Sequence, residues 1–90
     1  MKPVALLDLE GLILNGFIQH LEIIDCESPS NTRLSKIIGK LNDGTEVVTE
    51  CYEYSRLSRI YLVFVNYRDK NWFSEVKSRA VMSGITYDLE

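Results

Sequence analysis

The most pronounced hydrophobic pattern lies in the last third of the chain, where Ile60 to Val65 form a run of six apolar residues. The longer segment Arg59–Tyr67 is rich in β-branched and aromatic residues, which favour strands. The apolar positions of the run do not alternate with polar ones. The pattern therefore predicts a strand that is covered on both faces in the middle of a sheet.

A helix and a further strand are predicted to follow that run. Asp69 or Asn71 can cap a helix over about residues 71–83, and Gly84 suits the position at which many helices end. Alternating apolar residues in the segment Ile85–Leu89 predict a closing strand. Strand, helix and strand together make a C-terminal β-α-β unit, for which a right-handed crossover is expected.

Residues 32–42 are open to two interpretations. Their apolar positions recur at helical spacing, but Gly39 and adjacent β-branched residues disfavour a helix. The dipeptide Asp43-Gly44 between two β-rich segments is a strong hairpin signal, since both residue types tolerate positive φ. We favour the hairpin and keep the helix as the alternative.

The first 25 residues carry the least distinct pattern. Pro3–Asp8 is interpreted as a strand. Phe17–Ile24 is interpreted as a second strand after a bend at Gly16, although its apolar residues would also line one face of a helix. The sequence thus predicts an α+β fold, with a mostly antiparallel sheet and one main helix, in a single domain over residues 1–90.

Size and composition are those of an ordinary globular protein, with 90 residues of which 46% are hydrophobic and 26% charged. No apolar run approaches the ~20 residues that cross a bilayer, and the N-terminus is a poor signal peptide, so a cytoplasmic location is the default. Cys26 and Cys51 lack the spacing of a metal site. In a reducing cytoplasm we expect both to be free thiols, with a disulfide or a reactive thiol as the alternative.

Charge is distributed unevenly around a net value of −3. Residues 1–32 hold one basic residue against five acidic ones, whereas residues 54–80 hold six basic residues against two acidic ones. Aromatic side chains interleave with the basic ones in this second segment, and Tyr, Trp and Arg are the residues enriched at protein interfaces. The candidate binding residues are Tyr52, Tyr54, Arg56, Tyr67, Arg68 and Trp72.

These features predict a small non-catalytic regulator or inhibitor that acts by binding another protein and can form a homo-oligomer. A nucleic-acid-binding module is one of two alternatives, because aromatic and basic side chains on a sheet can stack bases and hold phosphates. The acidic net charge weighs against it. No catalytic residue, metal ligand or cofactor site is assigned: His20 has no nucleophile near it in sequence, and no phosphate-binding loop occurs.

Acidic residues suggest the other alternative, a metal-dependent nuclease. If the first and central strands were parallel neighbours, Asp8 and Asp69 would meet at one sheet edge and could hold Mg²⁺ or Mn²⁺ for phosphodiester hydrolysis. VALLDLEGL at residues 4–12 resembles the first strand of PIN-like nucleases of the NYN group, and VNYRDKNWFSEV at residues 65–76 resembles their second strand and following helix. Gly11 replaces the family's Asn, and the family's later acidic residues have no counterpart here, so the activity is not carried over.

Overall fold

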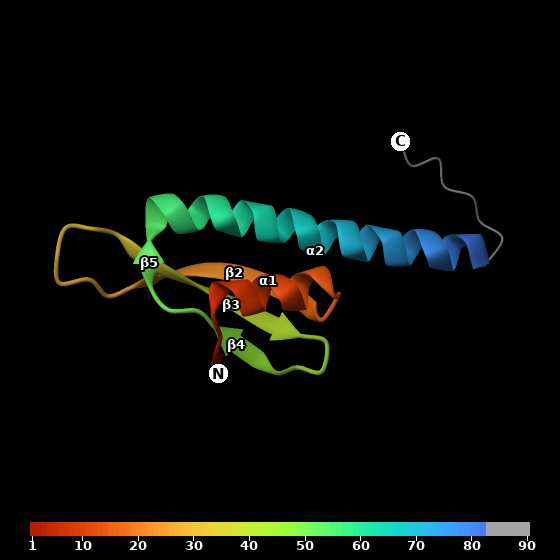
Figure 1. Cartoon of the computed structure of the whole chain (residues 1–90), viewed down its shortest axis with the longest axis horizontal. Coiled ribbons are helices and arrows are strands. Elements are labelled where there is room, and N and C mark those ends of the chain that lie inside the picture. The colour runs from red at the N-terminus through yellow and green to blue at the C-terminus, as the bar shows by residue number, and fades with distance from the viewer. Residues whose placement is uncertain (83–90) are drawn as a thin grey trace.

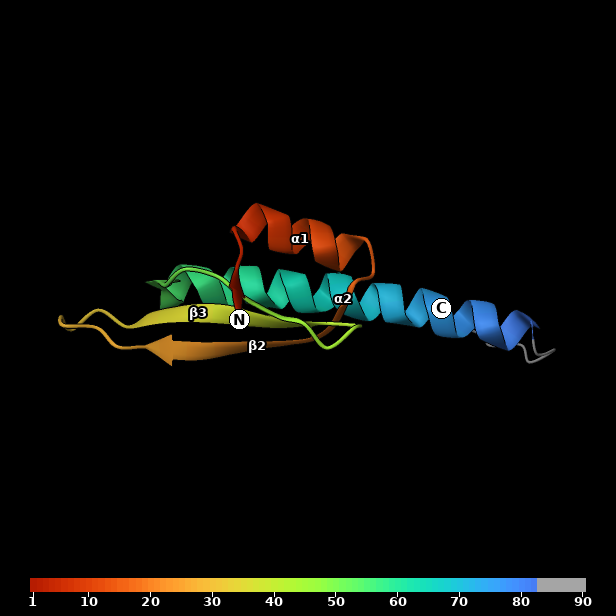
Figure 2. The ribbon, with the colours of Figure 1, turned by 90° about the horizontal axis from the view of Figure 1, so that it is seen from below.

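The computed structural model describes the backbone of residues 1–82 and the side chains of residues 1–70. Its elements in chain order are β1 (Lys2–Pro3), α1 (Leu6–Leu14), β2 (Ile18–Cys26), β3 (Leu34–Leu41), β4 (Glu46–Val48), β5 (Tyr52–Glu53) and α2 (Tyr54–Met82). The five strands form one sheet, and both helices lie on the same face of it (Figures 1 and 2). The predicted α+β class, with the main helix at the C-terminal end, is confirmed.

The sheet is built around β3. The strand order is β1-β4-β3-β2, and β5 pairs with the start of β3. All pairings of β3 are antiparallel, and only the short β1 runs parallel to its neighbour β4. The prediction of a mostly antiparallel sheet is therefore correct.

A tight turn between β3 and β4 confirms the predicted hairpin. The backbone N–H of Leu41 donates to the carbonyl of Thr45 at 2.8 Å, and Gly44 has a φ of 91°, which favours glycine. The backbone N–H of Thr45 also donates to a carboxylate oxygen of Asp43 at 2.9 Å. This hydrogen bond lowers the pKa of Asp43 below its ordinary value.

The first apolar segment is a helix, so the interpretation of Pro3–Asp8 as a strand is wrong beyond its first residue. Residues 6 to 14 form α1, and the chain turns away from the helix at Gly16, which has a φ of 78°. The N–H of Phe17 donates to the carbonyl of Leu12, and that of Gly16 to the carbonyl of Ile13, which is the Schellman arrangement. Gly16 is thus the predicted bend, but it ends a helix before β2 begins.

The central strand predicted over Arg59–Tyr67 is also wrong, because the whole segment lies within α2. Leu57 and Phe64 are buried at helical spacing, whereas Leu62 and Val63 between them are 63% and 44% exposed. A short apolar run does not by itself distinguish a buried strand from a helix. The β-α-β unit therefore lacks its first strand, the predicted helix over residues 71–83 is the distal part of α2, and the closing strand Ile85–Leu89 lies outside the described residues.

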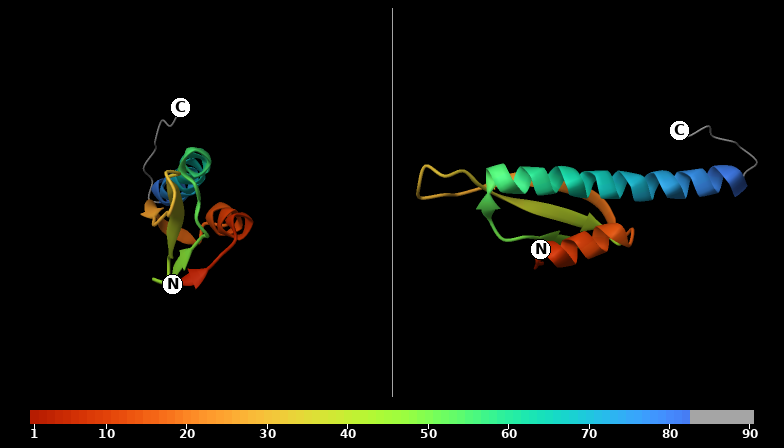
Figure 3. Two further views of the ribbon diagram at one scale, coloured as in Figure 1. Left: turned by 90° about the vertical axis from the view of Figure 1, so that its left-hand side faces the viewer. Right: turned by 45° about the horizontal axis from the view of Figure 1, so that its top comes forward.

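The hydrophobic core lies between the helices and the sheet. Among residues 1–70, each helix contributes two buried side chains to it, and three strands contribute the rest: Leu9, Ile13, Ile18, Leu21, Ile37, Val47, Leu57 and Phe64. Figure 3 shows this layering from the end of the sheet, with α1 and α2 side by side on one face. Within residues 1–82 no helix covers the opposite face of the sheet (Figure 2).

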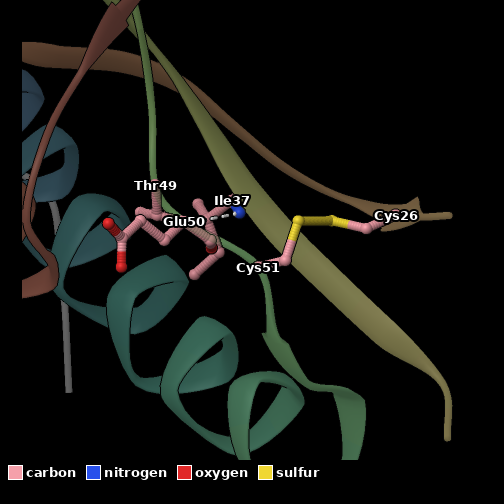
Figure 4. Close-up of a disulfide and its surroundings, with 5 residues drawn as sticks. All are labelled: Cys26, Ile37, Thr49, Glu50 and Cys51. Carbon is pink, nitrogen blue, oxygen red and sulfur yellow. Dashed lines mark hydrogen bonds between the residues drawn. A yellow bond between two sulfur atoms is a disulfide. The ribbon is translucent and has the colours of Figure 1, made fainter. Parts of the chain in front are cut away.

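A disulfide joins Cys26 at the end of β2 to Cys51 just before β5, with the two Cα atoms 6.4 Å apart (Figure 4). The expectation of free thiols is therefore wrong. β2 and β5 pair with opposite edges of β3, so the bridge connects the segments on the two sides of the central strand. Next to it, the Thr49 hydroxyl accepts from the backbone N–H of Ile37 at 3.0 Å and donates to the carbonyl of Glu50 at 2.9 Å.

Over the part of the chain that the structure describes, neither helix combines the length and the apolar content needed to cross a bilayer.

Candidate functional site

Part of the predicted site gathers where β5 passes into α2. Tyr54 lies under the guanidinium of Arg33, which is 3.7 Å from the ring centroid. Arg33 also pairs with Asp25 at 3.0 Å, and this hydrogen bond raises the pKa of the guanidinium above its ordinary value. The three side chains tie the loop after β2 to the start of α2. One face of the Tyr54 ring is therefore occupied within the chain.

The two predicted residues on either side of Tyr54 differ in exposure. Tyr52 on β5 is half-buried and packs against the core, while Arg56 in the first turn of α2 is exposed. Arg56 is therefore the residue of this group with the most open surroundings.

Tyr67 and Arg68 lie further along α2 and have contacts within the chain. Tyr67 packs partly buried against the core. Arg68 donates to the carbonyl of Gln19 at 3.2 Å and to Asp69 at 2.7 Å. Gln19 lies at the register shift between Ile18 and His20 of β2, where a bulge leaves backbone groups outside the ladder. Arg68 thus satisfies a strand carbonyl, which gives it a structural role.

The six predicted residues do not form one patch. Tyr54 and Tyr67 are 13 residues apart on the same helix, which places them about 20 Å apart along its axis at ~1.5 Å per residue. Trp72 lies on α2 beyond the residues whose side chains are described. The aromatic and basic residues that stand together in sequence are therefore spread along a helix instead of gathering on a sheet face.

The geometry on which the nuclease alternative depended is not found. Asp8 lies in the first turn of α1 and Asp69 lies on α2, where it pairs with Arg68. Neither residue ends a strand, and both segments that resemble NYN nucleases are largely helical instead of beginning with strands. Within the described residues, no group of three or more His, Cys, Asp or Glu side chains is placed to hold a metal ion.

An apolar stripe on α1 is the feature that the sequence interpretation missed. Leu7 is 80% exposed and Leu14 is 52% exposed, and the space around the Cα of Gly11 between them is open. Residues 7, 11 and 14 share one face of a helix, opposite the buried Leu9 and Ile13. We call Leu7, Gly11 and Leu14 the α1 stripe. Its i, i+4, i+7 spacing is visible in the sequence only once this segment is interpreted as a helix.

The outer face of α2 carries a second exposed apolar pair, Leu62 and Val63. Arg59 precedes this pair by one turn and Lys70 follows Val63 by two turns, and both are exposed. We call Arg59, Leu62, Val63 and Lys70 the α2 outer face. It contains two exposed basic residues, and the acidic Asp69 next to Lys70 is paired with Arg68, whereas the α1 stripe is flanked by acidic residues only.

The uncovered face of the sheet is more polar than the helix layer. In residues 1–70 the exposed large hydrophobic side chains are on the helices or in the segments beside α1, and none is on a strand: Met1, Leu7, Leu14, Phe17, Leu62 and Val63. Glu22 and Lys40 are exposed on strands, next to core residues that point to the helix side. The apolar surface available to a partner thus lies mainly on the helix layer.

Comparisons with known proteins add no relative. No protein-family model matches the sequence, and neither a curated protein nor a solved structure is significantly similar to the chain.

Proposed function

We propose that this protein is a small non-catalytic binding protein, a regulator or inhibitor, that acts by docking another protein chain on its helix layer. The observation that carries the proposal is the α1 stripe, in which Leu7 and Leu14 are exposed on the outer face of a helix whose inner face is already buried. The candidate contacts shift accordingly from the Tyr and Arg residues to α1 and the outer side of α2.

The composition of α1 supports this choice. In LLDLEGLIL only Asp8 and Glu10 are polar, so the helix is apolar nearly all round. A helix of that kind is normally buried on all sides, whereas α1 is covered only on the side of the sheet and α2. Exposed apolar surface flanked by charged residues is typical of protein interaction sites.

Gly11 suits such a contact as well. Nothing lies within 4 Å of the place where a Cβ would stand, so the glycine is not required by packing inside the chain. A glycine in a helix interior costs roughly 0.5–1 kcal/mol relative to alanine. On an exposed face this cost is offset if the missing side chain lets a second helix approach closely.

The disulfide bears on where the protein acts. Structural disulfides persist in oxidising environments and are rare in the cytoplasm. The bridge between Cys26 and Cys51 therefore favours action in an oxidising compartment over the cytoplasmic location expected from composition.

Site-specific photo-crosslinking tests the proposal. A photo-reactive phenylalanine analogue replaces Leu7 in one variant, Tyr54 in a second and Glu22 in a third, in the full chain expressed in its own host. Glu22 is the matched control, because it is exposed but lies on the uncovered face of the sheet.

The proposal expects a discrete crosslinked protein from position 7, weaker capture from position 54, and none from position 22. The captured protein, purified, should then bind the wild-type chain and lose at least ~10-fold in affinity to a variant with Leu7→Gln and Leu14→Gln, about 1.4 kcal/mol. Equal crosslinking from all three positions, or unchanged affinity of the variant, would reject α1 as the binding face.

A further inference from the structure

We infer that the chain that docks on the helix layer is a second copy of this protein, with the α1 stripe of each copy packed on the α2 outer face of the other. This inference rests on the proposed function, since it names the occupant of the same surface. Three properties of the two faces carry it: their apolar content, their charge and their placement side by side.

The apolar side chains of the two faces can pack into each other. Leu7 and Leu14 are seven residues apart, about 10 Å along α1 at ~1.5 Å per residue. On α2, the adjacent side chains of Leu62 and Val63 form one exposed apolar protrusion, with exposed fractions of 63% and 44%. The open space over Gly11 lies between the two leucines and has room for such a protrusion. Helices that meet at a glycine can approach closely, because no side chain separates their backbones.

The charges on the two faces are opposite. The α1 stripe is flanked by Asp8 and Glu10 and by no basic residue of α1. The α2 outer face contains the exposed bases Arg59 and Lys70, and its acidic neighbour Asp69 is already paired with Arg68. Pairing α1 with α1 of a second copy would bring four carboxylates together, whereas pairing α1 with α2 brings acids next to bases. Complementary potentials select one register and one partner over another.

The arrangement of the helices allows both contacts to form at once. α1 and α2 lie side by side in one layer on the same face of the sheet (Figure 3). A two-fold axis between them, parallel to the helices, places each α1 over the α2 of the other copy. Every contact then occurs twice, as in closed isologous dimers.

Sedimentation equilibrium of the full oxidised chain tests the inference. Concentrations from ~1 μM to ~1 mM cover the dissociation constants of weak and moderately tight dimers. We expect a monomer–dimer equilibrium. The variant Leu7→Gln/Leu14→Gln should raise the dissociation constant at least ~10-fold. Glutamine has nearly the helix propensity of leucine, and both positions are exposed, so the circular dichroism spectrum should not change.

Charge reversal tests the pairing of α1 with α2. Glu10→Lys and Arg59→Glu should each raise the dissociation constant several-fold, and the double variant should regain most of the loss, since each pair occurs twice in the dimer. Glu22→Lys is the matched control with the same change in net charge on the uncovered sheet face, and it should leave the dissociation constant unchanged.

The outcomes separate this inference from the proposed function. A wild-type chain that stays monomeric at ~1 mM, or a dimer insensitive to both the leucine and the charge substitutions, overturns the inference. If crosslinking from position 7 still captures a different protein, the proposed function stands. Crosslinking from position 7 to a second copy, together with rescue by the double charge reversal, supports both.

Discussion

Reduction of the disulfide between Cys26 and Cys51 should remove a large part of the stability of this protein. The bridge closes a loop between residues 25 positions apart and connects the segments on the two sides of β3. Its main effect is expected in the unfolded state, where it limits the conformations that the chain can adopt. The perturbation is a reductant on the wild-type chain or the double substitution Cys26→Ala/Cys51→Ala.

The magnitude follows from the length of the loop. For 25 residues the chain-entropy relation gives an entropy loss of about 12 cal/mol/K, which is ~3.5 kcal/mol at room temperature. A chain of 90 residues has a total stability of roughly 5–13 kcal/mol. The midpoint of thermal unfolding should therefore fall by about 15–25 °C on reduction.

Urea unfolding followed by circular dichroism is the assay, with and without a phosphine reductant. At a slope of roughly 1–1.5 kcal/mol per molar urea, the midpoint should fall by about 2.3–3.5 M on reduction. The double alanine variant is the control: its midpoint should equal that of the reduced wild type and should not respond to reductant. Intact mass before and after reduction checks that the bond was present at the start.

Two results would refute this reasoning. The first is an oxidised wild type that unfolds at the same urea concentration as the reduced protein. The second is a double alanine variant as stable as the oxidised wild type, which would mean that the fold closes this loop without help from the bond.

Three further predictions concern single side chains. Gly39→Ala should destabilise the fold by about 1 kcal/mol in urea unfolding, because a Cβ would lie 3.2–3.3 Å from three core side chains. Gly11→Ala adds a Cβ in open space and should stabilise the monomer by ~0.5–1 kcal/mol. A Gly39→Ala variant more stable than Gly11→Ala would contradict the packing. Ser35→Ala should raise stability by about 1 kcal/mol, since the Ser35 hydroxyl is buried without a hydrogen-bond partner among the described residues, and a lower urea midpoint would show that the hydroxyl has one. The pKa of Asp43 is lower in the folded state than in the unfolded state. The Asp43 carboxylate therefore stabilises the fold above the unfolded pKa of ~3.9, and this stabilisation is lost as the pH falls through the folded pKa. Asp43→Asn should therefore lose less stability than wild type between pH 5 and pH 2, and an NMR pKa for Asp43 at or above ~3.9 would exclude this effect.

Local chemistry in the sequence determined the features that depend on few residues. Asp43-Gly44 specified the turn between β3 and β4, because few residues other than glycine accept the positive φ found there. The glycine signal at Gly16 was equally local, and interpreting it as a bend placed the strand Phe17–Ile24 where β2 is found. These elements, together with the α+β class, were predictable for this reason.

The candidate site was less predictable, because it depended on a helix that was taken for a strand. The apolar run Ile60–Val65 is only six residues long, which is too short to distinguish a strand from a helix. In α2 only part of this run faces the core, and Leu62 and Val63 remain outside. The predicted cluster of Tyr and Arg residues separated along the helix for the same reason.

Long-range packing decided the rest. α1 is a helix although its first residues suggested a strand, because Leu9 and Ile13 become buried against the sheet and α2 only at helical spacing. The two cysteines are far apart in sequence and are brought together by the pairing of β2 and β5 with β3. Sequence periodicity shows which residues can share a face of an element, but only the tertiary arrangement shows which of those faces is covered and which is left for a partner.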